Sequence, residues 1–186
     1  MLHPVFIKNM VSNRCKLIII QLFKDFNLQP KEVFLGEVTL ESELTKEQFQ
    51  LVKLRLEQYG YSLITDNRAK IATKIKLVLV ALIEAETFDL SITLSEYIAE
   101  KLKYEYHYLS GLFSDIENIS IEKYFILLKI EKAKEYLEKG LLNIGEIAFK
   151  LGYSSPAHLA NQFKQITEMT PTQYKNLVQS NFTNKK

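Results

Sequence analysis

The sequence has one cysteine, three histidines and no long apolar run, and each scarcity excludes a class of protein. One cysteine cannot form an intramolecular disulfide, and it is compatible with the reducing cytoplasm, where we expect the protein to be located. The longest aliphatic run, at 77–83, is far shorter than the about 18 to 20 residues that a membrane span needs. The N-terminus also lacks the apolar core of a signal peptide. We therefore expect a soluble protein with no membrane partner.

The sequence also has almost no excess of one sign of charge over the other. The formal net charge of the 186 residues is +2, with 47% hydrophobic and 25% charged residues. This composition is typical of a folded globular protein of one or two domains. It provides no strongly basic surface, so any binding of nucleic acid has to depend on local geometry.

The motifs of enzymes and cofactor sites are absent too. There is no Gly-rich phosphate loop, no HExxH and no CxxC spacing. No histidine lies beside Cys15 in the sequence to form a nucleophile pair. We therefore predict a protein that is not an enzyme and that binds no cofactor.

Residues 143–174 predict two short helices joined by a tight turn, with a third helix behind them. Asn143 followed by Glu146 is a capping box that starts the first helix. Gly152 supplies the turn, and Ser155 followed by a proline starts the second helix. The inward-facing residues recur at helical spacing: Ile147, Ala148, Leu151, Leu159, Phe163 and Ile166. This is the pattern of a helix-turn-helix.

The second helix turns a polar face away from this core. At about 100° per residue, that face carries Ala157, His158, Asn161, Lys164 and Gln165. A helix enters the DNA major groove end first, so the first three are placed for base edges and Lys164 for phosphate. An ordinary three-helix core with a solvated outer face is the alternative that periodicity alone leaves open.

The same pattern occurs roughly 50 residues earlier, at 93–116, and it favours DNA binding over a merely solvated face. Thr93 and Glu96 form another capping box, and Leu109 and Phe113 repeat the two core residues of the later reading helix. The outward face here carries His107, Ser110, Gly111 and Ser114. Two helix-turn-helix units are therefore expected.

One long helix is expected between the two units, from Ser120 to Lys139, with Gly140 as its end. About 20 residues at about 1.5 Å each span about 30 Å. This is close to one turn of B-DNA, so such a helix could hold two reading helices in successive major grooves.

From about Leu90 to Val178 the chain resembles the C-terminal DNA-binding domain of the AraC/XylS family of bacterial transcription regulators. The most specific segment reads EIAFKLGYSSPAHLANQFKQITEMTPTQY, with its Gly-aromatic turn and closing Thr-Pro-x-x-Tyr. The resemblance implies an all-α domain that binds double-stranded DNA sequence-specifically and regulates transcription. It places the DNA contacts on Tyr106, His107, Ser110, Gly111, Lys129, Ser155, Ala157, His158, Asn161 and Lys164.

The first unit departs from the family pattern in two places. Its turn, Lys103-Tyr104, lacks the usual Gly or Asn. Gly111 takes a position often held by a long polar side chain, and it costs the helix about 1 kcal/mol relative to Ala. We expect this unit to read bases poorly and to recognise mainly the shape or the phosphates of the DNA. Three tyrosines either stack on bases or complete the core: Tyr104, Tyr106 and Tyr108.

The first 66 residues predict a separate small domain, which makes the fold class α+β. Its elements are a strand at Val5–Met10, a helix at Asn13–Phe26, one or two strands in 32–40, a helix opened by a Thr45–Gln48 capping box, and a strand at Tyr61–Ile64. The order is the split plan of a ferredoxin-like βαββαβ domain.

This segment also resembles heavy-metal-associated domains, small metal carriers whose loop reads Met-x-Cys-x-x-Cys. Here the loop at 10–15 reads MVSNRC, with Ser12 in place of the first thiolate. Soft ions such as Cu(I) favour thiolates, so we predict no metal site within one chain. For Cys15 we expect a structural or vestigial role, with redox sensing or a metal shared by two chains as alternatives. The domain itself is expected to act as a sensor or interaction module.

The expected layout is a heavy-metal-associated-like domain at 1–66, a linker helix at 67–87, the DNA-binding domain at 88–180 and a disordered tail at 181–186. The linker carries an apolar seam of Ile71, Ile75, Val78 and Leu82, which packs either on a second copy or on its own chain. Partners left open besides DNA are a homodimer, through this helix or the N-terminal domain, and a protein or metal effector. The alternative function is a metal or redox carrier in which the helical half only docks a protein.

Overall fold

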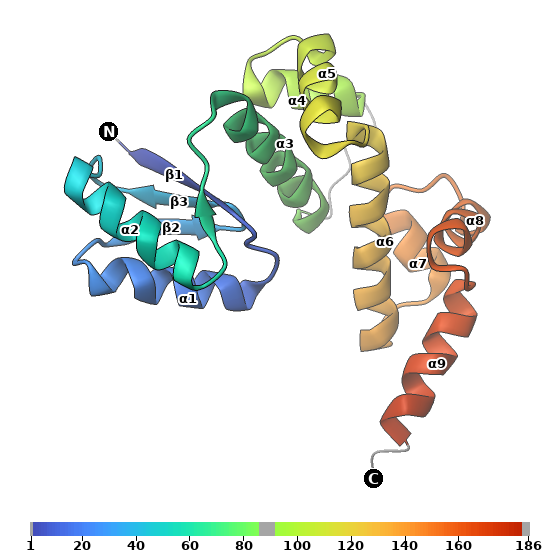
Figure 1. Ribbon diagram of the computed structural model, residues 1–186. Helices are drawn as coiled ribbons and strands as arrows, with labels where there is room; N and C mark the ends of the chain where they lie inside the picture. Colours follow the sequence, from blue (N-terminus) through green and yellow to red (C-terminus); the bar gives the residue numbers. More distant parts are fainter. Residues whose placement is uncertain (1, 86–91, 184–186) are drawn as a thin grey trace. The chain divides into compact units, whose positions relative to one another are not determined.

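The computed structural model describes residues 2–85 and 92–183, and the chain divides into two compact units, Met1–Leu77 and Val78–Lys186 (Figure 1). The boundary falls within α3 (Asn67–Glu84). Each unit has its own hydrophobic core.

Unit 1 is a four-stranded antiparallel sheet with two helices. Its elements are β1 (His3–Lys8), α1 (Asn13–Asp25), β2 (Pro30–Phe34), β3 (Glu37–Leu40), α2 (Lys46–Gln58) and β4 (Ser62–Leu63). The strand order is β2-β3-β1-β4, and every neighbouring pair is antiparallel. The predicted stretch 32–40 is therefore a hairpin of two strands. Gly36 sits in its turn with φ +101, and a Cβ there would lie 3.0 Å from Thr73 Cγ2.

The boundaries in unit 1 follow local conformation. β1 ends at Lys8, before the predicted Met10, because Asn9 adopts φ 73 and turns the chain out of the strand. The Thr45–Gln48 capping box forms as predicted, with both hydrogen bonds at 3.0 and 3.2 Å. The core joins both helices to the sheet through Ile7, Ile19, Phe23, Val38, Leu40, Val52 and Leu56.

Not every apolar residue of the expected helices faces this core. Leu17 of α1 is 70% exposed, and Leu51 and Leu54 of α2 are also exposed. Each lies on the side of its helix away from the buried stripe, which in α1 is Cys15, Ile19, Leu22 and Phe23. Helical spacing therefore identified the helices of unit 1 better than the direction of each side chain.

α3 begins at Asn67, where the linker was predicted to begin, and Asp66 accepts a hydrogen bond from the backbone N–H of Ala69 at 2.8 Å. Of the predicted seam, Ile75 and Leu82 are buried within the single chain. A dimer through this seam would first have to uncover them. Residues 86 and 87 of the predicted linker lie outside the described residues.

Unit 2 contains only helices among its described residues. After the end of α3 they are α4 (Leu94–Leu102), α5 (Tyr106–Glu117), α6 (Ile121–Lys139), α7 (Ile144–Lys150), α8 (Pro156–Thr167) and α9 (Pro171–Thr183). α6 is the long helix that the sequence predicts, and it ends at Gly140 with φ 68. It lies between the α4–α5 pair and the α7–α8 pair (Figure 1). The start of the predicted domain, 88–91, lies outside the described residues.

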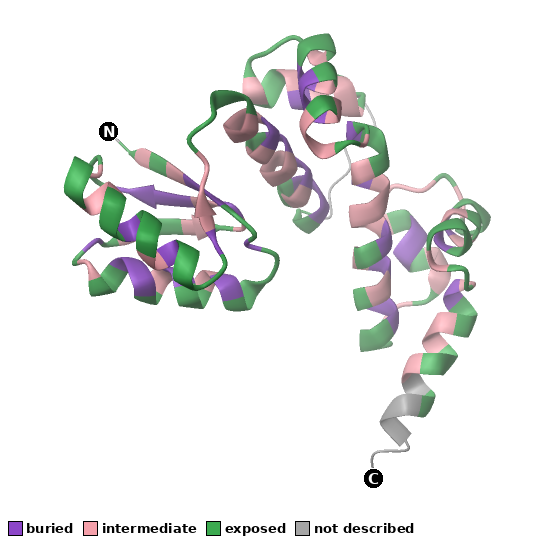
Figure 2. Ribbon diagram, viewed as in Figure 1, coloured by how far each residue is buried: buried purple, intermediate pink, exposed green. Residues whose placement is uncertain are grey.

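The second helix-turn-helix packs its inward residues against α6. Its core contains Ile147, Ala148, Leu151, Leu159 and Phe163, as predicted, together with Ile130, Ala133, Tyr136 and Leu137 of α6. Figure 2 shows buried stretches along α6 and on α7. Ile166 was expected in this core but is 36% exposed, because it lies in the last turn of α8, just before the chain leaves the helix at Glu168.

The C-terminal end differs from the expected disordered tail. α9 continues to Thr183, so residues 181–183 are helical, and 184–186 lie outside the described residues. Throughout the described ranges, no helix has both the length and the apolar composition of a membrane span.

The turns of the two helix-turn-helix units reach the same left-handed backbone conformation with different residues. Gly152 has φ +64 in the second turn, and Lys103 has φ 61 in the first. A left-handed conformation costs a residue with a Cβ about 1–2 kcal/mol, and glycine almost nothing. The first turn therefore carries a strain that the second avoids.

Replacing Gly152 by alanine should lower the free energy of unfolding by about 1 kcal/mol or more, because the new Cβ would stand in a left-handed backbone. Lys103→Gly is the matched variant. The glycine relieves the backbone strain of the folded state, but it also raises the conformational entropy of the unfolded chain. The free energy of unfolding should therefore stay unchanged or increase. Urea unfolding monitored by circular dichroism would measure both, and equal losses in the two variants would contradict the assignment.

Candidate nucleic-acid interface

The capping boxes and the second helices of the two helix-turn-helix units are related by an offset of 50 residues, and the relation extends to the helix that follows each unit, α6 and α9. The Thr93 and Asn143 capping boxes both form, with glutamates three residues on. In each unit a buried phenylalanine meets a tyrosine edge to face: Phe113–Tyr124 at 5.5 Å and Phe163–Tyr174 at 5.6 Å. The first turns of α6 therefore pack on the first unit in the same way as α9 packs on the second.

The reading face of α8 lies at the surface. Ala157, His158, Asn161 and Lys164 are all exposed. Ser155 is half-buried and is the N-cap, and its hydroxyl accepts a hydrogen bond from the backbone N–H of His158 at 3.1 Å. Of the residues predicted for the second unit, Ser155 thus fixes the start of α8, while the other four project from it.

Further contacts fix the turn before α8 to its first two turns. The Tyr153 hydroxyl donates a hydrogen bond to Gln162 Oε1 at 2.7 Å. The Tyr153 ring meets the His158 imidazole edge to face, with centroids 5.2 Å apart. Ser154 Oγ lies 3.1 Å from His158 Nδ1. Burial raises the pKa of Tyr153 to about 12, so its hydroxyl keeps its proton at neutral pH.

In the first unit, α5 exposes His107 and Gly111, whereas Ser110 and Tyr106 are half-buried. The Tyr106 hydroxyl donates a hydrogen bond to Glu122 of α6. Burial and that carboxylate raise the pKa of Tyr106, and the bond lowers the pKa of Glu122. Tyr106 was predicted as a DNA contact, but its hydroxyl is bound within the domain and fastens α5 to α6.

The 50-residue offset pairs Tyr108 with His158, the residue on the reading face of the second unit. Tyr108 is 46% exposed, and its ring lies 5.7 Å from that of Tyr104, tilted by 34°. The first unit thus exposes two neighbouring aromatic rings at the start of α5. The sequence left two roles open for these tyrosines, stacking on bases or completing the core. The exposed positions of Tyr104 and Tyr108 fit the first role, and the half-buried position of Tyr106 fits the second.

Lys129 of α6 lies beside the turn of the second unit. Its Nζ is 4.8 Å from the centroid of Phe125 and 5.0 Å from that of Tyr153. Burial lowers the pKa of Lys129 to about 8. The charge therefore stacks on aromatic rings, a contact that partly offsets its desolvation.

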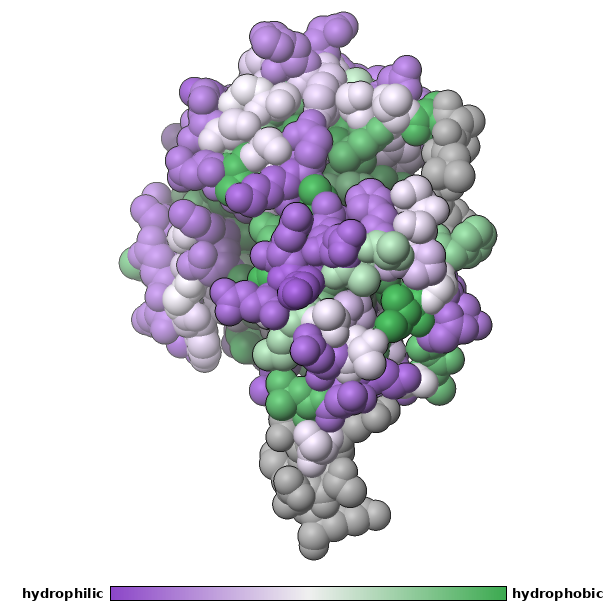
Figure 3. All heavy atoms as spheres, turned by 90° about the vertical axis from the view of Figure 1, so that its right-hand side faces the viewer, coloured by the Kyte–Doolittle hydropathy of each residue, from purple (hydrophilic) through white to green (hydrophobic). Residues whose placement is uncertain are grey.

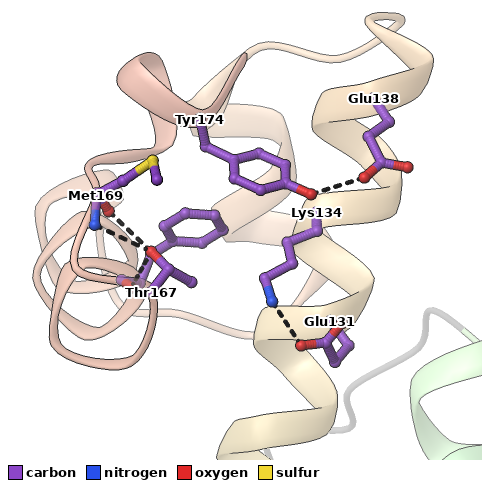
Figure 4. Close-up of polar contacts among 7 residues, drawn as sticks. Glu131, Lys134, Glu138, Thr167, Met169 and Tyr174 are labelled. Carbon is purple, nitrogen blue, oxygen red and sulfur yellow. Dashed lines mark hydrogen bonds and ion pairs between the residues drawn. The ribbon is translucent and has the colours of Figure 1, made fainter. Parts of the chain in front are cut away.

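α9 is tied to α6 by the last residue of the Thr-Pro-x-x-Tyr motif (Figure 4). The Tyr174 hydroxyl donates a hydrogen bond to Glu138 Oε1 at 2.7 Å. On the α8 side, Thr167 Oγ1 lies 2.8 Å from the carbonyl oxygen of Phe163, and it accepts a hydrogen bond from the backbone N–H of Met169 at 3.3 Å. These bonds hold the chain where it leaves α8.

The surface on the side of α8 and α9 mixes hydrophilic and hydrophobic residues (Figure 3). Its apolar areas are separated by hydrophilic side chains.

Cys15 is the other chemically distinctive side chain, and it lies in unit 1. It is buried in the first turn of α1, with Ser12 Oγ 3.5 Å from its sulfur. Hydrogen bonds from Ser12 and then from Tyr61 lower the pKa of the Cys15 thiol to about 7. The described residues contain no cluster of three or more His, Cys, Asp and Glu side chains that could hold a metal ion.

Comparison with known proteins gives several matches. A family model described as a helix-turn-helix domain matches residues 98–176. The chain is 24% identical over 135 residues to the Msm operon regulatory protein of Streptococcus mutans, covering 73% of this chain and 48% of that protein. It is 26% identical over 95 residues to the melibiose operon regulatory protein of Escherichia coli, covering 51% and 31%.

Among solved structures, the C-terminal domain of AraT, a response regulator from Geobacillus stearothermophilus, is similar with a TM-score of 0.51 and 26% identity. The match covers 60% of this chain and 88% of that one. The chain thus spans less than half the length of the two curated relatives but nearly all of this isolated domain.

Stability should rise between pH 8 and about pH 10 through Lys129. The folded protein releases this proton near pH 8 and the unfolded chain near its ordinary value of 10.5, so the unfolded state binds more protons within the window. Above about pH 10 the trend reverses, because Tyr153 and Tyr174, with pKa values of about 12, keep protons that the unfolded chain loses. Urea unfolding at half-unit steps from pH 7 to pH 10 would measure the rise.

Lys129→Met is the matched variant. It should remove the rise and should stabilise the domain at pH 7 by about 1 kcal/mol, a value that allows for the partial exposure of Lys129. Parallel pH profiles for the wild type and the variant would contradict the burial of a charged lysine.

The reactivity of the Cys15 thiol should follow the pKa that its hydrogen bonds set. The rate of alkylation by iodoacetamide should rise with a midpoint near pH 7, because the thiolate is the reactive form. Ser12→Ala should move the midpoint upward more than Tyr61→Phe does, since the Ser12 bond lowers the pKa most. A midpoint that neither variant moves would show that these hydroxyls do not act on the sulfur.

Proposed function

We propose, from the AraC-type helix-turn-helix domain that residues 98–176 form, that this protein is a sequence-specific DNA-binding regulator of transcription. The observation that carries the proposal is the reading face of α8. There, Ala157, His158, Asn161 and Lys164 project from a capped helix whose other side is buried. The relatives named above are operon regulatory proteins, which supports the same role.

α8 is suited to enter the major groove by its N-terminal end. His158 and Asn161 are in its first two turns and carry groups that can bond to base edges. Lys164 is farther along and reaches phosphate. The positive dipole at the start of the helix adds an attraction for phosphate that needs no basic side chain.

α6 is proposed to set the spacing between two reading helices. Its 19 residues span about 28 Å, close to one turn of B-DNA. Bonds from Tyr106 and Tyr174 to Glu122 and Glu138 attach α5 and α9 to the two ends of α6. With both ends fixed, α5 and α8 would occupy successive major grooves.

The first unit is proposed to make the less selective contact. His107, Ser110 and Gly111 are the contacts expected from its sequence, and two of them carry little or no side chain. The exposed rings of Tyr104 and Tyr108 can pack on sugar or base without selecting a base strongly. This unit would therefore contribute affinity and register more than base discrimination.

For unit 1 we propose a ferredoxin-like domain at 1–66, similar to heavy-metal-associated domains, that acts as a sensor or interaction module. The order of its elements and its antiparallel β2-β3-β1-β4 sheet support the fold. A homodimer and a protein or metal effector are proposed partners of this half. The cytoplasm is the proposed location, since transcription regulators act on the chromosome.

The alternative of a metal or redox carrier is the weaker candidate. A soft metal ion favours several thiolates, and the sequence contains one cysteine. Within the described ranges no second ligand cluster compensates for the missing thiolate. A metal or redox carrier would also have no use for the exposed polar face of α8.

DNA binding is tested by selecting bound fragments from a random duplex pool with the intact chain and titrating the selected sequence at two salt concentrations. The double variant His158→Ala, Asn161→Ala should lose about 1 to 3 kcal/mol of discrimination per altered contact. Lys164→Ala should instead weaken all sequences alike and flatten the salt slope by about one unit.

Lys53→Ala, an exposed lysine of α2, is the control and should change neither quantity. Failure of the intact chain to enrich any sequence would reject the proposed function. Stoichiometric uptake of Cu(I) or Zn(II) without DNA selectivity would favour the carrier instead.

A further inference from the structure

We propose that Tyr153 and Ser154 lock the imidazole of His158 so that it presents its Nε2–H to a purine in the major groove. The proposal rests on the proposed function and adds the class of base that the second unit reads. It concerns four residues, Tyr153, Ser154, His158 and Gln162, which we call the His158 clamp.

Two contacts fix the ring of His158, and a third fixes its backbone. Ser154 Oγ lies 3.1 Å from Nδ1, and the Tyr153 ring stands against the imidazole at 88° with centroids 5.2 Å apart. The backbone N–H of His158 is held by the N-cap Ser155 at 3.1 Å. Position and tilt of the imidazole are thereby set before DNA arrives, and Nε2 is the ring nitrogen left to meet a ligand on this exposed side chain.

Tyr153 is itself fixed from two sides. Its hydroxyl donates to Gln162 Oε1 at 2.7 Å, one turn along α8 from His158. On α6, Lys129 Nζ lies 5.0 Å from the centroid of the Tyr153 ring. The clamp therefore joins the turn, the reading helix and α6, so the His158 ring is oriented by residues outside its own turn of helix.

The contact with Ser154 determines which hydrogen-bonding group Nε2 offers. A serine hydroxyl donates or accepts, and a neutral imidazole carries its proton on only one nitrogen. When Ser154 donates to Nδ1, the proton must be on Nε2. A doubly protonated ring also carries a hydrogen there. The remaining tautomer would aim a lone pair at the negative potential of DNA, which disfavours it.

A single donor at this place selects among bases by their acceptors. In the major groove, guanine offers N7 and O6, adenine offers N7, and thymine offers O4 beside its methyl group, whereas cytosine presents an amino group, itself a donor. The guanine pair of adjacent acceptors gives one N–H the widest target. His158 is thus assigned to a purine and works against cytosine at the same position.

The first unit lacks this device at the corresponding residues. The second helices of the two units align at an offset of 50, which pairs Tyr108 with His158. The left-handed turn residues Lys103 and Gly152 align at an offset of 49, which pairs Tyr104 with Tyr153 and leaves Ser154 without a counterpart in the first unit. Instead of a hydroxyl on a ring nitrogen, the first unit has two aromatic rings tilted by 34°, with centroids 5.7 Å apart. The difference in chemistry at matched positions indicates that the clamp is particular to the second unit and that the two units read DNA unequally.

The test replaces purines one at a time by 7-deaza analogues in the duplex selected by the intact chain, and measures the dissociation constant at each position. Loss of one N7 acceptor should weaken binding by about two- to tenfold at one position, the value of a single neutral hydrogen bond. That effect should vanish in His158→Ala. It should shrink in Ser154→Ala and return in Ser154→Thr, which keeps the hydroxyl.

Tyr153→Phe is the second control, because it removes only the bond to Gln162 and leaves the ring against His158. It should retain most of the 7-deaza effect. Circular dichroism and unfolding in urea would verify that each variant is folded.

The arms of the experiment separate two failures. Selective binding with no 7-deaza position that depends on His158 would overturn the purine assignment while the proposed function stands. An effect of His158 found only when a thymine is replaced by an analogue lacking O4 would overturn it as well. A Ser154→Ala variant equal to wild type at every position would overturn the clamp. Absence of any sequence selectivity would remove the proposed function itself.

Discussion

Packing on α6 is the constraint on which the whole of the helical half depends. Ile130, Ala133 and Leu137 are buried against α7 and α8, and each large apolar side chain buried in this way contributes about 1.5–3 kcal/mol. The two tyrosine–glutamate hydrogen bonds fix the orientation of α5 and α9 on α6, because each bond requires one hydroxyl to meet one carboxylate oxygen. Without α6, the units would be pairs of short helices, which are too short to be stable alone.

What the sequence predicted best were features that a few consecutive residues determine. The capping boxes at Thr45, Thr93 and Asn143 form with the expected partners three residues on. The end of α6 at Gly140 and the turn at Gly152 follow from a residue that tolerates positive φ. Such features depend on backbone geometry within one turn, and distant residues do not change them. The same rule explains why the boundaries of most helices are predictable to within a residue or two.

What the sequence could not predict are contacts between segments. Tyr106 and Glu122 lie on different helices, and nothing in the spacing of either indicates that the hydroxyl turns inward. Lys129 reads as a surface lysine until α6 packs beside the turn that carries Tyr153. Helical spacing gives the face of a helix but not the neighbour of that face, which is also why Ile166 was misplaced. The polar surface of α8 was predictable because it requires only that the opposite face be buried.

The small net charge makes this fixed geometry more consequential. On the proposed function, a chain of net charge +2 would gain little from long-range attraction to DNA, so its nonspecific binding would be weak and its discrimination would have to come from short-range contacts. Short-range hydrogen bonds contribute most when their donors are already oriented, because no conformational entropy is then lost on binding. A histidine held by Ser154 and Tyr153 meets this condition, whereas a lysine on a flexible stem does not. Selectivity in a weakly charged reader is therefore expected to concentrate at its most rigid side chains, and the surroundings of α8 supply that rigidity.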